Sequence, residues 1–247
     1  TGSTGDGFDW LTAVGHTVVR PSPALVPVAV KEKWVADLMG ISFANAKLTV
    51  LQAGLKREER TGKLLFTHFG LSGPLVLNMG RAIGDLLEAG PVTLSVDLYP
   101  KLDPGALDVM VLGILEANKN KLLKNATGEL FAPRMADPLF RQAGIDGETP
   151  VYRFSKEQRL ALVSAMKGFR LSASHLLGEE KAIVTSGGVE LKEVDFRTMR
   201  SKVHDNLYLI GDILDFDRPS GGFSLQLCWT TGWIAGGAAG AQCALAE

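Results

Sequence analysis

Short stretches with the two-residue period of β-strands dominate the chain between Pro21 and about Pro100. From Pro91 to Leu98, apolar residues alternate with Thr, Ser and Asp, which is typical of a strand with one buried face. Further strand candidates are short and rich in β-branched or large apolar residues, at 24–30, 47–51 and 63–66. One helix is expected within this β-rich region, from Pro74 to Ala89, with proline in its first turn.

The periodicity becomes helical from Asp103 to about Ser174. Pro104 precedes an apolar pattern with helical spacing that runs from Leu107 to Leu123. Ser155 and Gln158 have the spacing of a capping box, in which each residue satisfies a backbone N–H group of the other. We therefore expect a block of helices after the β-rich region.

A strand, a loop and a helix are expected near the C-terminus. Leu207 to Ile210 is a short apolar run, as in a buried strand of an α/β sheet, and Gly211 ends it. Asp212 then lies at the carboxyl end of the strand, where open α/β sheets bind ligands. Gly221 and Gly222 open a long helix, whose first N–H groups favour an anion or a carbonyl oxygen.

The last helix is apolar enough that a membrane span has to be weighed. Gly232, Gly236 and Gly240 recur every four residues, so they share one face and allow close packing against a sheet. Polar residues interrupt the segment from Leu225 to Ala246, and no basic cluster flanks it. A buried helix against a sheet is therefore favoured over a membrane span.

Four blocks resemble one known family. They are TGSTGDGF at residues 1–8, LLFTHFGLSGPLVLN at 64–78, AIVTSGGVELKEVD at 182–195 and NLYLIGDILDFDRPSGGFSLQLCWTTGWIAG at 206–236. In the same order, these blocks resemble the BaiN/YhiN-like flavoproteins, which are FAD-dependent NAD(P) oxidoreductases. The resemblance runs over essentially the whole chain.

The resemblance implies an α/β plus β-barrel fold in three parts. Residues 1–20 and 200–247 would form part of a Rossmann-like FAD-binding domain, 21–102 and 175–199 a small β-barrel domain, and 103–174 a helical insert. Strand character at Lys181 to Val194 would complete the barrel. The glycine-rich loop that binds the FAD pyrophosphate does not occur in this sequence. We therefore expect that a missing N-terminal segment of the same protein supplies half of the cofactor site.

The resemblance also assigns roles to individual residues. The backbone of Thr185, Ser186, Gly187 and Gly188 would approach the flavin ring. Gly221, Gly222, Phe223 and Ser224 would offer N–H groups near its N1/O2 edge. Gly211 would allow a close backbone approach, and Asp212 would accept hydrogen bonds from cofactor hydroxyls. FAD would carry the hydride, NAD(P)H would supply it, and the substrate would be an unsaturated or oxidised small molecule.

Composition narrows the class of partner and the compartment. The 247 residues carry a formal net charge of −1, which gives no general attraction to nucleic acid or to a membrane. Cys228 and Cys243 lie 15 positions apart on one expected helix, or roughly 22 Å, too far for a disulfide. We therefore expect a cytoplasmic protein with no membrane partner, and the charge does not favour a nucleic-acid partner.

Other chemistries find little support in the pattern. The histidines His16, His68, His175 and His204 are scattered, without the spacing of a metal-ligand pair, so no metal is expected. A metal site or a serine hydrolase would have to combine residues from unlinked parts of the chain. His68 is a weak candidate for a proton donor beside a flavin, and a structural hydrogen bond is the simpler interpretation. Arg218 is expected in a solvated loop.

One alternative stays open from a different functional class. The barrel and the insert could form a non-catalytic module that binds a protein or nucleic-acid partner. A flavin spectrum would separate this alternative from the oxidoreductase.

Overall fold

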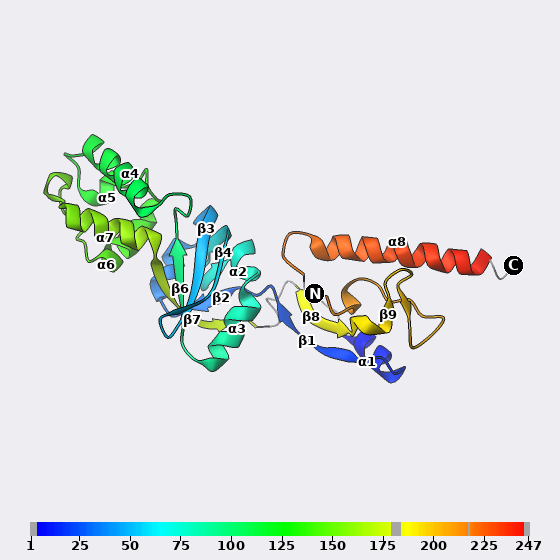
Figure 1. The fold of residues 1–247 in the computed structure, drawn as a ribbon. Helices are drawn as coiled ribbons and strands as arrows, with labels where there is room; N and C mark the ends of the chain where they lie inside the picture. Colours follow the sequence, from blue (N-terminus) through cyan, green and yellow to red (C-terminus); the bar gives the residue numbers. More distant parts are fainter. Residues whose placement is uncertain (1–3, 179–183, 217, 245–247) are drawn as a thin grey trace. The chain divides into compact units, whose positions relative to one another are not determined.

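The computed structural model describes residues 4–178, 184–216 and 218–244 (Figure 1). The chain forms two compact units. The terminal unit consists of Thr1–Leu25 and Gly178–Glu247, and the barrel unit consists of Val26–Leu177. Each unit has a hydrophobic core of its own.

The centre of the barrel unit is a closed antiparallel β-barrel. Its strands follow one another in the order β2-β5-β4-β3-β6-β7. Their bounds are β2 Val28–Val30, β3 Ser42–Gln52, β4 Leu55–Phe66, β5 Gly70–Ser72, β6 Val92–Asp97 and β7 Phe169–Leu176. The expected combination of a β-barrel with α/β structure is confirmed.

The period-two pattern explains the inside of the barrel. Alternate residues of β3 point inward, so Ala46, Leu48 and Val50 are fully buried. Phe66 and Phe169 meet in the core with ring centroids 6.3 Å apart in an edge-to-face arrangement. The strands are longer than the apolar runs that predicted them, since β3 and β4 continue into an exposed hairpin.

Two helices cover the barrel where one was expected. The stretch from Pro74 to Ala89 divides into α2 (Pro74–Leu77) and α3 (Gly80–Ala89). A Cβ atom at Gly80 would lie 2.9 Å from the carbonyl oxygen of Val26, so the start of α3 lies directly against the segment before β2. The expected single helix is therefore divided at Asn78 and Met79.

The helical insert lies between β6 and β7, at one end of the barrel (Figure 1). It contains α4 (Pro104–Ala117), α5 (Leu123–Ala126), η2 (Pro133–Met135), α6 (Ala136–Ala143), η3 (Val151–Arg153) and α7 (Lys156–Lys167). Lys167 joins the insert to the barrel, because its ammonium group lies 2.6 Å from the Asp97 carboxylate and donates to two carbonyl oxygens. The capping box of Ser155 and Gln158 is confirmed.

The first helix of the insert is shorter than its pattern suggested. The helix α4 ends at Ala117, and the chain turns through Asn118. The Asn118 side chain donates to the carbonyl oxygen of Ile114 at 2.8 Å and satisfies a group that the helix end leaves free. The expected continuation to Leu123 is therefore wrong.

The terminal unit combines both ends of the described chain. Its elements are α1 (Asp6–Ala13), β1 (Val18–Ala24), β8 (Val184–Val189), η5 (Leu191–Glu193), β9 (Val194–Asp195), β10 (Arg200–Ser201), η6 (Gly211–Ile213) and α8 (Phe223–Ala244). The strands β1 and β8 pair antiparallel, with an irregular register between Val19 and Ser22. The core includes Val189, Met199, Leu209 and Leu214.

The expectation that Lys181 to Val194 completes the barrel is wrong for its described residues. The strand β8 pairs with β1 in the terminal unit. In the barrel, β7 already pairs with β2 on one side and with β6 on the other. A closed barrel leaves no free strand edge, so β8 has no place in it.

Candidate functional site

The candidate cofactor residues all fall in the terminal unit, on β8, η6 and the start of α8. They divide into a buried group and an accessible group. Ser186, Gly187, Gly188 and Gly211 are buried, and Thr185 lies on β8 with its neighbours. Asp212 and the residues from Gly221 to Ser224 are accessible.

Gly188 allows β8 to lie directly against the segment that follows η6. Its φ is +136°, and a Cβ atom there would lie 2.5 Å from the carbonyl oxygen of Ile213. The amide of Asp215 donates to the carbonyl oxygen of Val189 across the same contact, at 3.1 Å. The protein's own backbone therefore accounts for the need for glycine at this position.

Gly211 likewise allows close packing, here between η6 and α8. Its φ is +66°, and a Cβ atom there would lie 2.9 Å from the Cys228 sulfur. Its amide donates to the Thr231 hydroxyl at 2.9 Å. The close approach expected at Gly211 is therefore an approach to helix α8.

Asp212 is the accessible acidic group next to this contact. Its side chain is 55% exposed, and its carboxylate accepts a hydrogen bond from the buried guanidinium of Arg218 at 2.5 Å. Arg218 is only 5% exposed, so its expected place in a solvated loop is wrong. The ion pair leaves the outer side of the Asp212 carboxylate open to a hydroxyl donor.

The glycine pair before α8 leaves open space. Gly221 has a φ of +108° and Gly222 a φ of +89°, and nothing lies within 4 Å of a Cβ atom built at Gly222. The helix that follows has 22 residues, so its first turn presents free N–H groups and positive potential. These features suit a negatively charged or carbonyl-bearing group.

The expected buried strand from Leu207 to Ile210 does not form as a regular strand. Tyr208 makes one isolated bridge to Arg200, and the amide of Leu209 donates to the carbonyl oxygen of Met199. Leu209 is buried, but Ile210 is 45% exposed. A strand needs hydrogen-bonding partners on its edges, and the described residues offer this segment little beyond β10.

The expected burial of α8 is also wrong among the residues that the structure describes. A narrow stripe that includes Thr231 and Ala235 packs inward, whereas Trp229 is 66% exposed and Trp233 is 85% exposed. Apart from neighbouring residues of the helix itself, no described atom lies within 4 Å of a Cβ atom built at Gly236 or Gly240. The apolar surface of this helix is therefore larger than the part that the described residues cover.

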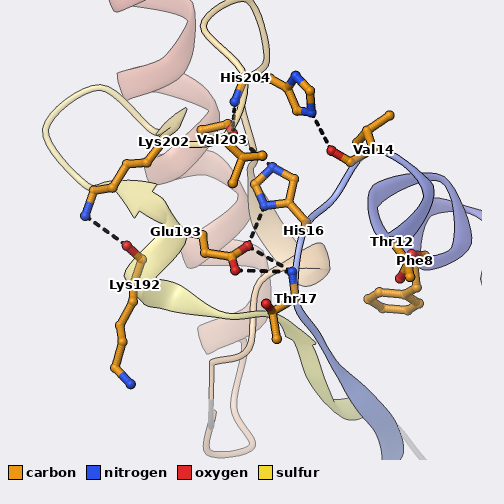
Figure 2. Close-up of polar contacts among 11 residues, drawn as sticks. Phe8, Thr12, Val14, His16, Thr17, Lys192, Glu193, Lys202, Val203 and His204 are labelled. Carbon is orange, nitrogen blue, oxygen red and sulfur yellow. Dashed lines mark hydrogen bonds and ion pairs between the residues drawn. The ribbon is translucent and has the colours of Figure 1, made fainter.

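A second polar cluster, which the sequence did not indicate, lies in the same unit (Figure 2). The His16 ring is buried between two partners: its Nδ1 lies 2.7 Å from the Glu193 carboxylate and its Nε2 lies 2.9 Å from the Ser201 hydroxyl oxygen. Glu193 also accepts the amide hydrogen of Thr17. The three side chains come from the α1–β1 connection, η5 and β10, which are far apart in the sequence.

The order Ser–His–Glu is that of a hydrolase triad, but the hydroxyl is not available as a nucleophile. Ser201 is buried, and its oxygen accepts the amide hydrogens of Val203 and His204. Since both lone pairs are occupied, the hydroxyl donates to Nε2 of His16, which makes the ring the Nδ1–H tautomer that donates to Glu193. The cluster therefore serves to hold three segments together.

The charge on Glu193 is stabilised by this arrangement. Hydrogen bonding from Thr17, opposed by partial burial and assisted by His16, lowers the pKa of the Glu193 carboxyl. His204, at the edge of the cluster, bonds through Nε2 to the carbonyl oxygen of Val14. Two of the scattered histidines thus converge, with ring centroids 6.3 Å apart.

His68 lies in the barrel unit, whereas the candidate cofactor residues lie in the terminal unit. Its side chain is exposed, and its ring stands edge-to-face on Phe69 with centroids 4.9 Å apart. None of the described residues makes a hydrogen bond to this ring. No proton-transfer partner therefore supports a catalytic role for His68.

Neither a metal cluster nor a membrane-spanning helix occurs within residues 4–178, 184–216 and 218–244. In these ranges, no group of three or more His, Cys, Asp or Glu side chains is arranged to hold a metal ion. In the same ranges, no helix is long and apolar enough to cross a membrane.

Comparison with known proteins gives one family match and several relatives. Residues 22–184 match the family model described as the HI0933-like protein barrel and H2TH domain. A 3-dehydro-bile acid delta(4,6)-reductase of Clostridium scindens is 30% identical over 239 residues, which are 96% of this chain and 58% of the relative.

Two other relatives carry a different name. The ribosomal RNA dihydrouridine synthase of Escherichia coli is 28% identical over 235 residues, and that of Haemophilus influenzae is 27% identical over 234 residues. Each match covers 94% of this chain and 55% of the relative. The chain therefore spans a little more than half the length of these curated relatives.

Proposed function

Since this chain belongs to the HI0933-like family, we propose that it is part of an FAD-dependent oxidoreductase that reduces a carbon–carbon double bond. The family match agrees with the resemblance to the BaiN/YhiN-like proteins. The names of the relatives describe a reductase of a 3-dehydro-bile acid and ribosomal RNA dihydrouridine synthases. Both names imply addition of hydrogen to a double bond, a reaction that a flavin can carry out with NAD(P)H as the donor.

The observation that carries the proposal is the open glycine pair at the start of α8. A bulky cofactor can approach a backbone only where no side chain intervenes, and Gly222 provides such a place. The N–H groups of Gly222, Phe223 and Ser224 would face an electronegative edge of the cofactor. Positive potential from the helix would stabilise negative charge on a reduced flavin.

The other candidate residues would have two kinds of role. Asp212 is exposed and would accept hydrogen bonds from cofactor hydroxyls, while the buried Arg218 holds its carboxylate in place. Gly188 and Gly211 would act indirectly, because they allow β8, η6 and α8 to pack closely. When bound, FAD would accept hydride from the donor and pass it to the substrate.

A further segment of the same protein is part of this proposal. The segment would supply the pyrophosphate-binding loop, sheet strands beside Leu207 to Ile210, and a cover for the exposed face of α8. Trp229 and Trp233 support this arrangement, since large apolar side chains at such exposure mark a surface that binds another element. We use the term parent protein for a chain that contains these 247 residues together with that segment.

Absorption spectroscopy of the purified parent protein tests the proposal. We expect flavin absorbance that disappears when NADH or NADPH is added without oxygen. A parent protein without flavin, which also fails to bind added FAD, would rule out the proposed chemistry. It would leave the non-catalytic module as the surviving alternative.

A further inference from the structure

The barrel unit contains a cleft of about 640 Å³ between the barrel and the helical insert. Its walls come from the start of η1 (Lys33–Leu38), from β6 and β7, and from α6 and α7. All of these elements belong to one compact unit. The volume lies within the range of small-molecule sites, roughly 300–1,000 Å³.

Two arginine side chains line the cleft without a counter-ion. Arg141 and Arg170 are exposed, and neither guanidinium makes a hydrogen bond or an ion pair with any residue that the structure describes. Arg159 in the same insert differs, because it forms a two-bond ion pair with Asp108. Two unpaired guanidinium groups in one cleft favour an anionic ligand.

One pair of hydrogen bonds fixes the backbone that carries the two arginines. The Gln142 side chain donates to the carbonyl oxygen of Arg170 at 2.7 Å and accepts its amide hydrogen at 2.9 Å. This pair of bonds ties the end of α6 to the start of β7, so Arg141 and Arg170 are presented by a rigid frame. Glu32 is the acidic residue among the described cleft residues. Both of its carboxylate oxygens accept a hydrogen bond from the amide of Ser172, each at 3.0 Å.

An indole and two hydroxyl groups also line the cleft. Trp34 is half-buried and stands edge-to-face on Phe169 with centroids 5.8 Å apart. Ser95 and Ser164 line the same space. An indole beside two guanidinium groups combines a stacking surface for a base with donors for a phosphate.

We propose that this cleft binds a phosphate-bearing nucleotide, with Arg141 and Arg170 on the phosphate and Trp34 against the base. The nucleotide is either free or part of a single RNA strand, since the recognising chemistry is the same. The net charge of −1 gives no general attraction to nucleic acid, but a local pair of cations acts over a few ångströms. The inference does not rest on the proposed flavin chemistry.

A neighbouring hollow limits where the phosphate lies. This hollow of about 210 Å³ shares Trp34 and Arg141 with the cleft. It also contains Asp37 and Asp137, and Arg134 there already donates to two carbonyl oxygens. Carboxylates repel phosphate, so the phosphate is kept out of this hollow. Glu32 also keeps its negative charge, but in the cleft the two guanidinium groups outnumber it.

Binding measurements on the whole 247-residue chain test this inference. Uridine monophosphate is titrated by tryptophan fluorescence, and a fluorescein-labelled oligouridylate of about six nucleotides is titrated by anisotropy at low salt. For whichever probe binds, Arg141→Gln and Arg170→Gln should each raise Kd about ten- to hundredfold, as expected when a charge-assisted hydrogen bond is removed. The matched control is Arg153→Gln, which removes an equal charge from an exposed arginine of the insert outside the cleft.

The two probes distinguish the sources of the nucleotide. A strand that binds at least tenfold more tightly than the mononucleotide identifies RNA, and any smaller difference identifies a free nucleotide. With RNA, the slope of log Kd against log salt should fall by about 0.7 for each phosphate that a variant no longer neutralises. The inference is overturned if neither probe binds, or if Arg153→Gln weakens binding as much as the cleft variants do.

Discussion

Gly188 and Gly222 both have a positive φ, yet their surroundings differ. A Cβ atom at Gly188 would collide with backbone atoms of residues 213–215, whereas a Cβ atom at Gly222 meets nothing within 4 Å. A positive φ favours glycine at both positions, and packing within the terminal unit gives a second reason at Gly188 only. The open space at Gly222 is what the proposed cofactor would fill.

Substitution at Gly188 should destabilise the terminal unit. We expect Gly188→Ala to lower the free energy of unfolding by at least about 2 kcal/mol, from the clash together with the strain of a positive φ. Denaturant unfolding of the 247-residue chain measures this change. Gly222→Ala is the matched control and should cost only the strain, about 1–2 kcal/mol. An equal loss of unfolding free energy in both variants would show that the protein accommodates the added methyl group at Gly188 without a packing cost.

The Glu193 carboxylate should contribute to stability in a pH-dependent way. Because its pKa is lowered in the folded state, its contribution is present above the unfolded pKa and is lost as pH falls through the folded pKa. We expect Glu193→Gln to cost about 1–2 kcal/mol at pH 7, and this cost to shrink below about pH 4. Denaturant unfolding of the wild type and the variant, at pH 7 and again below about pH 4, measures this cost.

Glu190→Gln serves as the control for that experiment. Glu190 pairs with Lys192, whose side chain is 89% exposed, so its removal should have little effect at either pH. A constant cost of Glu193→Gln across the pH range would contradict the assigned role of the carboxylate charge.

A substitution of the accessible residue Asp212 tests whether its carboxylate contacts the cofactor. In the parent protein, Asp212→Ala should weaken FAD binding, since a charged acceptor contributes roughly 1.5–3 kcal/mol. A fluorescence titration of FAD into the apo-protein measures the change. Unchanged affinity would show that Asp212 only holds Arg218.

At the scale of elements, the sequence pattern predicted correctly those features that depend only on residues close together in the chain. The strand alternation of β6 and the capping box of α7 depend on residues within each segment, and both are confirmed. The close approach of Gly80 to Val26, next to the break between α2 and α3, joins distant residues and is revealed by no periodicity. The pairing of β8 with β1 joins residues more than 150 positions apart, so the sequence could not indicate it.

The candidate site shows the same division. The sequence suggested the glycine pair and Asp212 as candidates, because an apolar run, a polar loop and a helix start follow one another along the chain. It could not indicate His16, Glu193 and Ser201, since only folding brings these side chains together. The arginines of the cleft were missed for the same reason, as Arg141 and Arg170 lie on separate elements.

The helix α8 provides a prediction at this scale. In the 247-residue chain, Trp233→Glu should change the free energy of unfolding by less than about 0.5 kcal/mol, because the side chain is 85% exposed. In the parent protein, the same change should destabilise the fold, since the proposed segment covers this face. Ala235→Glu is the control and should destabilise both proteins, because Ala235 is buried. Equal stability of the parent protein and its Trp233→Glu variant would contradict the proposed cover.

At the scale of the whole molecule, the proposed cofactor site and the proposed nucleotide site belong to different units. The terminal unit contains the candidate cofactor residues, and the barrel unit contains the cleft with two unpaired arginines. The 247-residue chain should purify with little FAD, because it lacks a pyrophosphate-binding glycine loop. Absorbance of the purified chain after dialysis measures this, and a stoichiometric flavin that resists dialysis would show that the site has been misplaced.

The flavin content of Gly222→Ala in the parent protein, measured together with the melting temperature of its apo form, tests the central claim most directly. If the start of α8 faces the cofactor, the added methyl group enters cofactor space. We then predict a folded apo-protein whose FAD occupancy, or flavin reduction potential, falls below that of the wild type. A variant with a lower melting temperature but with wild-type flavin content and potential would contradict the claim, because Gly222 would then serve only the turn.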